Sequence, residues 1–240
     1  MCWHPEREGP GFWLLSRHAD VVAVSRDHGT FSSYEGGVMT PDLEPPGLAV
    51  NRMMLLNMDP PAHTKLRNLV NRGFTPRQVA RLEPRIRELA DGIVAAVAPE
   101  GRCDFVTQVA GELPSALIAE LMGIPIADGR RLYEWTERMH SAGDPAGVQT
   151  AAAQMLHYAG ELRRRKREAP ADDIASVLLA SEIDGERLSD LEFDLFFLLL
   201  INAGGDTTRN LVAGGMLTLL RHPEQLDGPR RMPVRFRARS

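Results

Sequence analysis

The chain has 240 residues, of which 43% are hydrophobic and 25% are charged, and its formal net charge is −4. This ordinary globular composition excludes a disordered chain, a collagen and a disulfide scaffold, and its acidic balance does not favour nucleic-acid binding. Only two cysteines are present, and the longest uncharged apolar run, Leu195 to Ile201, is far shorter than the roughly 20 residues of a membrane span. With no secretory leader at the start, we expect a cytoplasmic protein without a membrane span.

The N-terminal segment predicts a strand followed by a helix. Residues 11–15 are aromatic and apolar after Gly and Pro, as in a short strand, and residues 18–27 carry valines at helical spacing. Residues 32–56 combine Ser, Gly and Pro without periodicity and predict a long loop. Loops of this length often line a ligand site.

From Asp59 onward the sequence predicts helices. Asp59 followed by two prolines is typical of a helix start, with Asp59 as the N-cap of a helix that ends at Gly73. A capping box at residues 75–78 opens a second helix, and Pro84 is expected to start a third. Further helices are expected at 106–122 with a break near Pro114, 127–141, 146–168 and 172–181.

The last predicted helix is long for a globular protein. A capping box at Ser189–Glu192 opens it, and the apolar pattern continues to about residue 220. The basic run at residues 163–167 is interpreted as the exposed end of a preceding helix. The Arg-rich tail, residues 229–240, has no periodicity, and a disordered end is favoured over a segment that binds nucleic acid or anionic lipid.

The middle of the long helix contains residue types that are locally unfavourable in a helix interior. After the apolar run come Gly204, Gly205, Asp206 and Thr207, although glycine weakens a helix and a buried carboxylate needs a partner. One explanation is chemical: an acid beside an alcohol can relay protons, and glycines let a flat ligand approach the backbone. The other is structural: the glycines permit close helix packing and Asp206 pairs with a distant arginine. These residues alone leave both explanations open.

A second candidate site is the pair His63 and Arg67. The two residues are four apart, so they share one face of the predicted helix. Together they can hold a carboxylate or phosphate, although an isolated pair of this kind is more typical of a solvated helix face. No metal-ligand cluster has convincing spacing, and no phosphate-binding loop is present.

Six segments, in order between Gly11 and Gln225, resemble a bacterial cytochrome P450. They are residues 11–13, 31–33, 59–67 with 74–77, 119–125, 203–208 and 221–225. The resemblance implies a mainly α fold with a few short N-terminal β-strands and a long central helix at about 190–220. It implies a partial cytochrome P450 domain over residues 1–228, followed by the tail.

The resemblance also assigns roles to the two candidate sites and implies haem as the cofactor. Asp206 and Thr207 would be the acid–alcohol pair that delivers protons for catalysis. His63 and Arg67 would bind the haem propionates. In the long helix, Ala203 and Gly204 would form the dioxygen groove.

By family, the activity would be hydroxylation of a hydrophobic small molecule. The resemblance is strongest to the actinobacterial branch, whose substrates include sterols, terpenoids and fatty-acid chains, and a complete protein would take electrons from a ferredoxin-type donor. Two family features are missing from the sequence: the Glu-x-x-Arg helix after residues 221–223, and the late loop whose cysteine thiolate binds iron. Neither Cys2 nor Cys103 lies in that context. We therefore expect that this chain alone is not a competent monooxygenase.

Two other functions are compatible with the sequence. The first is a non-catalytic helical remnant or apolar-ligand-binding protein of the same ancestry. The second is an unrelated helical regulator whose Arg-rich tail contacts nucleic acid, which the ordered motifs make improbable.

Overall fold

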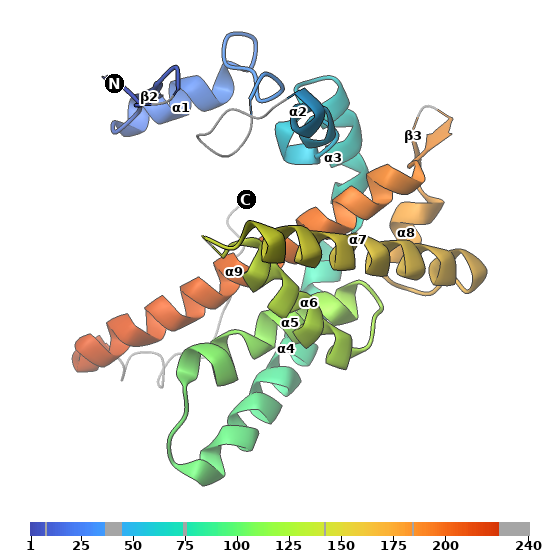
Figure 1. The fold of residues 1–240 in the computed structure, drawn as a ribbon. Coiled ribbons are helices and arrows are strands. Elements are labelled where there is room, and N and C mark those ends of the chain that lie inside the picture. Colours follow the sequence, from blue (N-terminus) through green and yellow to red (C-terminus); the bar gives the residue numbers. More distant parts are fainter. Residues whose placement is uncertain (8, 37–44, 74–75, 142, 184, 226–240) are drawn as a thin grey trace. The chain divides into compact units, whose positions relative to one another are not determined.

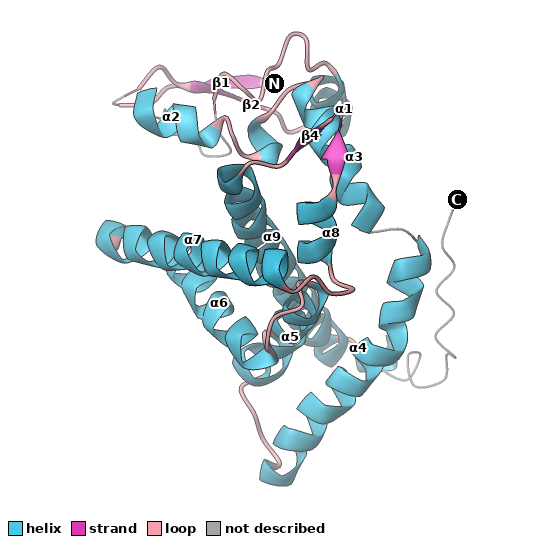
Figure 2. Cartoon of the chain, turned by 90° about the vertical axis from the view of Figure 1, so that its right-hand side faces the viewer, coloured by secondary structure: helices cyan, strands magenta, loops and turns pink. Residues whose placement is uncertain are grey.

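The computed structural model describes residues 1–7, 9–36, 45–73, 76–141, 143–183 and 185–225, and helices dominate it (Figure 1). Strands are confined, among these residues, to two short hairpins (Figure 2). The chain divides into two compact units. One comprises Met1–Ala80 with Ala153–Leu199, and the other comprises Arg81–Ala152 with Leu200–Ser240.

The first unit opens with an aromatic hairpin and a helix. Strand β1 (Cys2–His4) pairs antiparallel with β2 (Phe12–Leu14), and the rings of Trp3 and Trp13 meet edge to face with centroids 5.3 Å apart. Helix α1 (His18–Arg26) follows. The predicted strand and helix are confirmed, whereas β1 was not predicted because its alternation is only three residues long.

The predicted loop over residues 32–56 is partly wrong. Helix α2 (Pro45–Asn51) and a single turn η1 (Leu55–Asn57) lie within it, while residues 37–44 lie outside the described part of the chain. The two prolines that indicated a loop instead occupy the first turn of α2, where a missing backbone N–H has no cost. The Asn57 side chain is 1% exposed and joins η1 to α2 by donating to the Asn51 carbonyl at 3.1 Å.

Helix α3 (Ala62–Gly73) contacts η1 and α8 (Ile174–Ala180). Its buried face carries Leu66 and Leu69, which are 8% and 2% exposed. Burial of these leucines fixes the rotation of α3 about its axis, and this rotation decides which of its other side chains are exposed.

The sequence predicted that the basic end of α7 (Pro145–Glu168) is exposed. The structure shows this only in part. Lys166 is 8% exposed and pairs with Asp173, whose carboxylate also accepts from the Ser176 amide and so caps α8. Arg163 donates to Asp194 at 3.0 Å. Buried or half-buried cations need such partners, and both acids follow α7 in the sequence at distances that no local pattern encodes.

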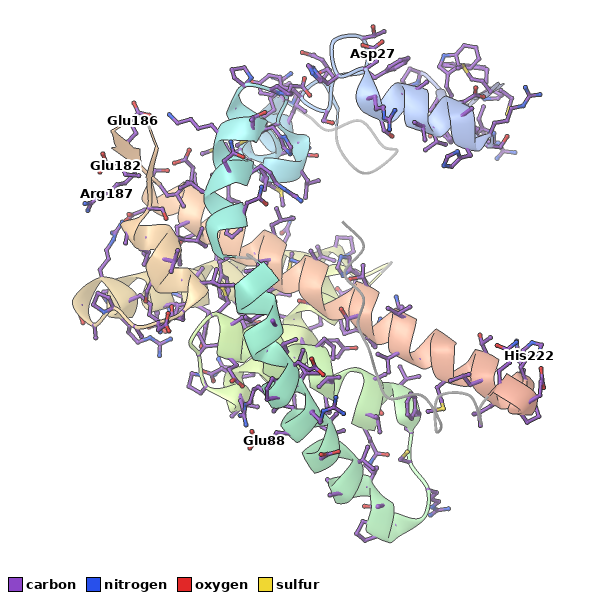
Figure 3. The ribbon with its side chains drawn as sticks, turned by 180° about the vertical axis from the view of Figure 1, so that it is seen from behind. Asp27, Glu88, Glu182, Glu186, Arg187 and His222 are labelled. Carbon is purple, nitrogen blue, oxygen red and sulfur yellow. The ribbon has the colours of Figure 1, made fainter. Side chains whose placement is uncertain are left out.

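A second hairpin, β3 (Glu182–Ile183) with β4 (Glu186–Arg187), was not predicted. Its charged side chains extend from the hairpin (Figure 3). Glu186 pairs with Lys65 of α3 at 3.3 Å. The hairpin is thereby joined to the helix that carries His63 and Arg67.

In the second unit, the expected third helix does not begin at Pro84. Helix α4 runs without interruption over Pro76–Val97 and contains Pro84 in its interior, while residues 74–75, part of the predicted capping box, lie outside the described residues. Proline removes one backbone donor, but the helix continues on both sides of it.

Helices α5 (Glu112–Leu121) and α6 (Ile126–Met139) form the most extensive helix pair of this unit. The break expected near Pro114 lies at Gly111, between the short π-helix η3 (Val106–Ala110) and α5. Met122, Leu132 and Trp135 are buried around the crossing.

Helix α9 (Asp190–Arg221) confirms the long predicted helix. Its capping box is formed as expected: the Ser189 N–H donates to Glu192 at 2.8 Å, and the Glu192 N–H donates to Ser189 at 3.3 Å. Leu195–Leu198 are all at most 8% exposed, as the apolar run predicted. Among the described residues, no single helix is long and apolar enough to cross a membrane. One bent pair of helical segments, residues 106–121 and 126–139, meets the criterion when the two are taken together, by length and composition alone.

Candidate functional site

The central segment of α9 remains helical through Ala203–Thr208. The Thr207 hydroxyl donates to the Ala203 carbonyl one turn earlier, at 2.8 Å. Both residues are exposed, and since they are four apart they share one face of α9. This face of α9 is solvent-exposed, and the Thr207 hydroxyl on it is hydrogen-bonded to a backbone carbonyl of the same helix.

Gly204 and Gly205 lie on the packed side of the same helix. A Cβ atom on Gly204 would lie 2.9 Å from Ile118 Cδ1 of α5, closer than an ordinary carbon contact. A Cβ atom on Gly205 would lie 3.7 Å from the Tyr133 ring of α6, which is an ordinary contact. Since Cδ1 is the flexible end of the Ile118 side chain, this packing favours a small residue at position 204 without requiring glycine.

Asp206 lies between two nitrogen-bearing side chains. Its Oδ2 atom is 3.2 Å from His140 Nδ1, just after α6, and its Oδ1 atom is 3.3 Å from Arg209, one turn further along α9. The arginine is therefore a near neighbour in the sequence rather than a distant one. Because the Asp206 side chain is only 24% exposed, these partners compensate part of the cost of its burial.

Arg209 is shared between two acids. It contacts Asp206, donates to Glu137 Oε1 at 2.5 Å and donates to the Tyr133 hydroxyl. Burial lowers the pKa of Arg209, but its hydrogen bonds to Tyr133 and Glu137 outweigh this effect and raise the pKa overall. Burial also raises the pKa of Tyr133. The cluster consequently holds a charged guanidinium, a neutral phenol and two carboxylates.

The second candidate site lies on α3 in the first unit. His63 is half-buried and Arg67 is exposed, one helical turn apart on the same face. The His63 N–H donates to the Asp59 carbonyl at 3.0 Å, which forms the first turn of the helix. Two hydrogen-bond donors with this spacing are available on α3.

The predicted N-cap role of the Asp59 side chain is wrong. Its carboxylate turns away from the helix and accepts from the Ser32 hydroxyl and, at 3.0 Å, from the Ser33 N–H. The hydrogen bond from Ser32 is the largest of the effects that lower the pKa of Asp59, and the backbone amides of Ser33 and Tyr34 add to it. Asp59 is thus ionised at neutral pH and joins two segments that lie far apart in the sequence.

The structure brings each group of predicted residues together within its own unit. The donors of α3 fit a ligand with carboxylate groups, such as the propionates of haem, because charged hydrogen bonds of this kind are strong and directional. Cys2 and Cys103 are both exposed, and among the described residues no three His, Cys, Asp or Glu side chains converge on one point. The residues present therefore fit the periphery of a haem.

Comparison with known proteins finds similar proteins over most of the chain. No family model matches the chain. The steroid C26-monooxygenase of Mycobacterium tuberculosis is 41% identical over 224 residues, which are 90% of this chain and 52% of that protein. The methyl-branched lipid omega-hydroxylase of Mycobacterium bovis is 39% identical over 91% of this chain and 53% of that protein. Among solved structures, a Mycobacterium marinum cytochrome P450 in complex with pseudoionone is 37% identical and superimposes with a TM-score of 0.84 over 94% of this chain and 58% of that one.

Over nearly its whole length the chain is similar to part of a bacterial cytochrome P450. A Bacillus subtilis cytochrome P450 of bacillaene polyketide synthesis gives the same TM-score of 0.84 at 29% identity. The chain spans about half the length of the curated relatives it matches. The resemblance read from the six motifs and the mainly helical cytochrome P450 fold are thereby confirmed.

Three residues around Asp206 were missed by sequence reasoning. Arg209 had a local signal, since it lies three residues after Asp206 and such pairs are neighbours on a helix. Tyr133 of α6 and His140, just after that helix, had none, because they lie more than 60 residues earlier in the sequence. They reach Asp206 only through tertiary packing.

Proposed function

We propose that this chain supplies the distal part of a haem-dependent cytochrome P450 monooxygenase site. In this proposal Asp206 and Thr207 are the acid–alcohol pair that delivers protons, and His63 and Arg67 bind the haem propionates. Haem, when bound, supplies binding and reductive activation of dioxygen. Ala203 and Gly204 form the groove beside it.

The observation that carries this proposal is the setting of Asp206 next to Thr207. A half-buried carboxylate with His140 and Arg209 as partners is held in place and remains within reach of solvent protons through the exposed imidazole. The neighbouring hydroxyl group lies on the open face of α9. A carboxylic acid beside an alcohol suits stepwise proton transfer.

The substrate class proposed is a hydrophobic small molecule. The relatives are named for a steroid and for a methyl-branched lipid, and both are largely apolar. From the same similarity we infer a ferredoxin-type electron donor and a cytoplasmic location.

The chain alone is proposed not to be a competent monooxygenase. An axial thiolate favours O–O cleavage by donating electron density to iron. Cys2 lies in strand β1 and Cys103 in a connection; both are exposed, and neither has the sequence context of the family's cysteine loop. The catalytic centre therefore requires sequence that these 240 residues do not contain.

A haemin titration with a carbon monoxide difference spectrum tests the proposal on the purified full chain. Replacing His63 or Arg67 by Ala should each weaken haemin affinity about tenfold, the effect of losing one charge-assisted hydrogen bond. Arg87→Ala is the matched control, because Arg87 is an exposed cation of α4 that pairs with a neighbouring helical acid, Glu83. Equal effects of all three variants, or no haemin binding by the parent chain, would refute the α3 site.

The reduced, carbon monoxide-bound protein reports the axial ligand separately. We expect a Soret band without the strong red shift that a thiolate ligand produces. A strongly red-shifted band would show that Cys103 or Cys2 reaches the iron. The expectation that the isolated chain is incompetent would then be wrong, whatever the outcome of the titration.

A further inference from the structure

Asp59 stands where two parts of the first unit meet. Its two carboxylate oxygens accept from Ser32 and Ser33, and the Tyr34 N–H donates to the Ser32 hydroxyl at 3.1 Å. These contacts close the segment Ser32–Tyr34 around the carboxylate. A single side chain thereby accepts two hydrogen bonds from residues 26 or more positions earlier.

The backbone of the same residue begins α3. The Asp59 carbonyl accepts from the His63 N–H at 3.0 Å, and the Pro61 carbonyl accepts from the Lys65 N–H at 3.0 Å. Pro60 and Pro61 lie between the carboxylate and the helix, and each fixes its own φ angle. Few backbone rotations therefore separate the anchored side chain from the first turn that carries His63.

The segment Ser32–Tyr34, which donates hydrogen bonds to Asp59, is itself fixed by residues at and just after the end of α2. Arg52 donates to the Tyr34 carbonyl at 2.8 Å, and its guanidinium lies 4.2 Å from the centre of the Tyr34 ring. Asn51 donates to the Gly36 carbonyl at 3.2 Å. The anchor is therefore a framework of several segments rather than one mobile loop.

We propose that Asp59 is a positioning residue that fixes the first turn of α3 and thereby places His63 and Arg67 to bind the carboxylates of haem. This inference rests on the proposed role of His63 and Arg67. Asp59 itself does not touch the ligand in this proposal. It acts through the helix whose first hydrogen bond it accepts.

Amide hydrogen exchange on the full chain tests the positioning without any ligand. Asp59→Ala should accelerate exchange of the His63 and Lys65 amides about tenfold, because the first turn opens without its anchor. Exchange in α8, in the same unit, should change much less. Asp59→Asn should recover most of the protection, since its amide oxygen can still accept from the Ser33 N–H.

Asp27 provides the matched control. It is an exposed acid of the same unit whose carboxylate accepts from a backbone N–H, that of Thr30 at 3.2 Å, without a link to α3 (Figure 3 labels it at the end of α1). Asp27→Ala should leave His63 exchange unchanged. Equal acceleration in α3 and α8, or unchanged His63 exchange in Asp59→Ala, would overturn the proposal. If the alanine variant does not fold, Ser32→Ala removes one donor to the Asp59 carboxylate and should still accelerate His63 exchange, and unchanged exchange in that variant would overturn the proposal.

A double-mutant cycle on haemin affinity separates positioning from general stability. Asp59→Ala should weaken haemin binding in the parent chain about as much as Arg67→Ala, and should have little further effect once His63 and Arg67 are both replaced. Additive losses would overturn the link to the haem site. If the parent chain binds no haemin, the α3 site of the proposed function fails, while the exchange experiment still decides whether Asp59 fixes the first turn.

Discussion

One glycine sets how closely α5 and α6 approach. A Cβ atom on Gly129 of α6 would lie 2.5 Å from the Ser115 carbonyl oxygen and 2.9 Å from the Ala119 Cβ, both in α5. The first is a backbone atom and the second has no rotamer to change. Neither can move away unless the whole helix moves, so Gly129→Ala should push the two helices apart.

The expected magnitude follows from two opposing effects. Alanine is better than glycine in a helix interior by about 1 kcal/mol. Overpacking typically costs about 1–3 kcal/mol, and contact with backbone places this site at the upper end. Gly129→Ala should therefore lower the free energy of unfolding by about 1–2 kcal/mol. Gly92 of α4, in the same unit, has nothing within 4 Å of its Cβ position, and Gly92→Ala should raise that free energy by about 0.5–1 kcal/mol.

Urea unfolding followed by tryptophan fluorescence measures both variants. Trp135 of α6 is 8% exposed and reports on this unit, whereas Trp3 and Trp13 belong to the other unit and are replaced by Phe in every variant. The two alanine variants should move the unfolding midpoint in opposite directions. A midpoint for Gly129→Ala equal to or above that of the parent would refute the close approach of α5 and α6.

Two further perturbations test the charged networks. Arg209→Ala leaves Glu137 and Asp206 without their shared cation, so the free energy of unfolding at neutral pH should fall by about 1–3 kcal/mol. Arg209→Lys should recover part of this loss, and unchanged stability in Arg209→Ala would show that the cluster is not formed. Because the pKa of Asp59 is lowered in the folded chain, its carboxylate contributes stability above its ordinary pKa, and this contribution is lost as the pH falls through the folded pKa. Asp59→Asn should therefore flatten the acid side of the stability profile below about pH 4 and leave its shape near neutrality unchanged, and an unaltered acid limb would contradict the pKa shift.

The elements that the sequence predicted well are those determined by local patterns. The long helix was predicted from an apolar run bounded by a capping box, and the side-chain oxygens of Ser189 and Glu192 each accept from the other residue's backbone N–H, as expected. The buried run Leu195–Leu198 followed from its lack of any polar face. In each case the interacting atoms lie within a few residues of one another.

The errors have the opposite character, since distant residues decided them. Asp59 has the right local context for an N-cap, but Ser32 and Ser33 offer its carboxylate better donors. Lys166 was predicted to lie at an exposed helix end, but it is buried and forms an ion pair with Asp173. A single sequence gives no signal for such pairings, because they depend on which segments the fold places side by side.

The two explanations that the sequence left open for Gly204 and Asp206 apply to different faces of α9. Gly204 approaches the Ile118 side chain, so packing favours a small residue there. Packing does not account for a carboxylate that requires both His140 and Arg209 as partners, nor for a hydroxyl group at Thr207 on the open face. A helix that needed only close contact would be more stable with apolar or small residues there, because a half-buried charge is costly even when it is paired. Packing thus favours a small residue at position 204, whereas proton delivery is the role that we propose for the acid and alcohol that follow it.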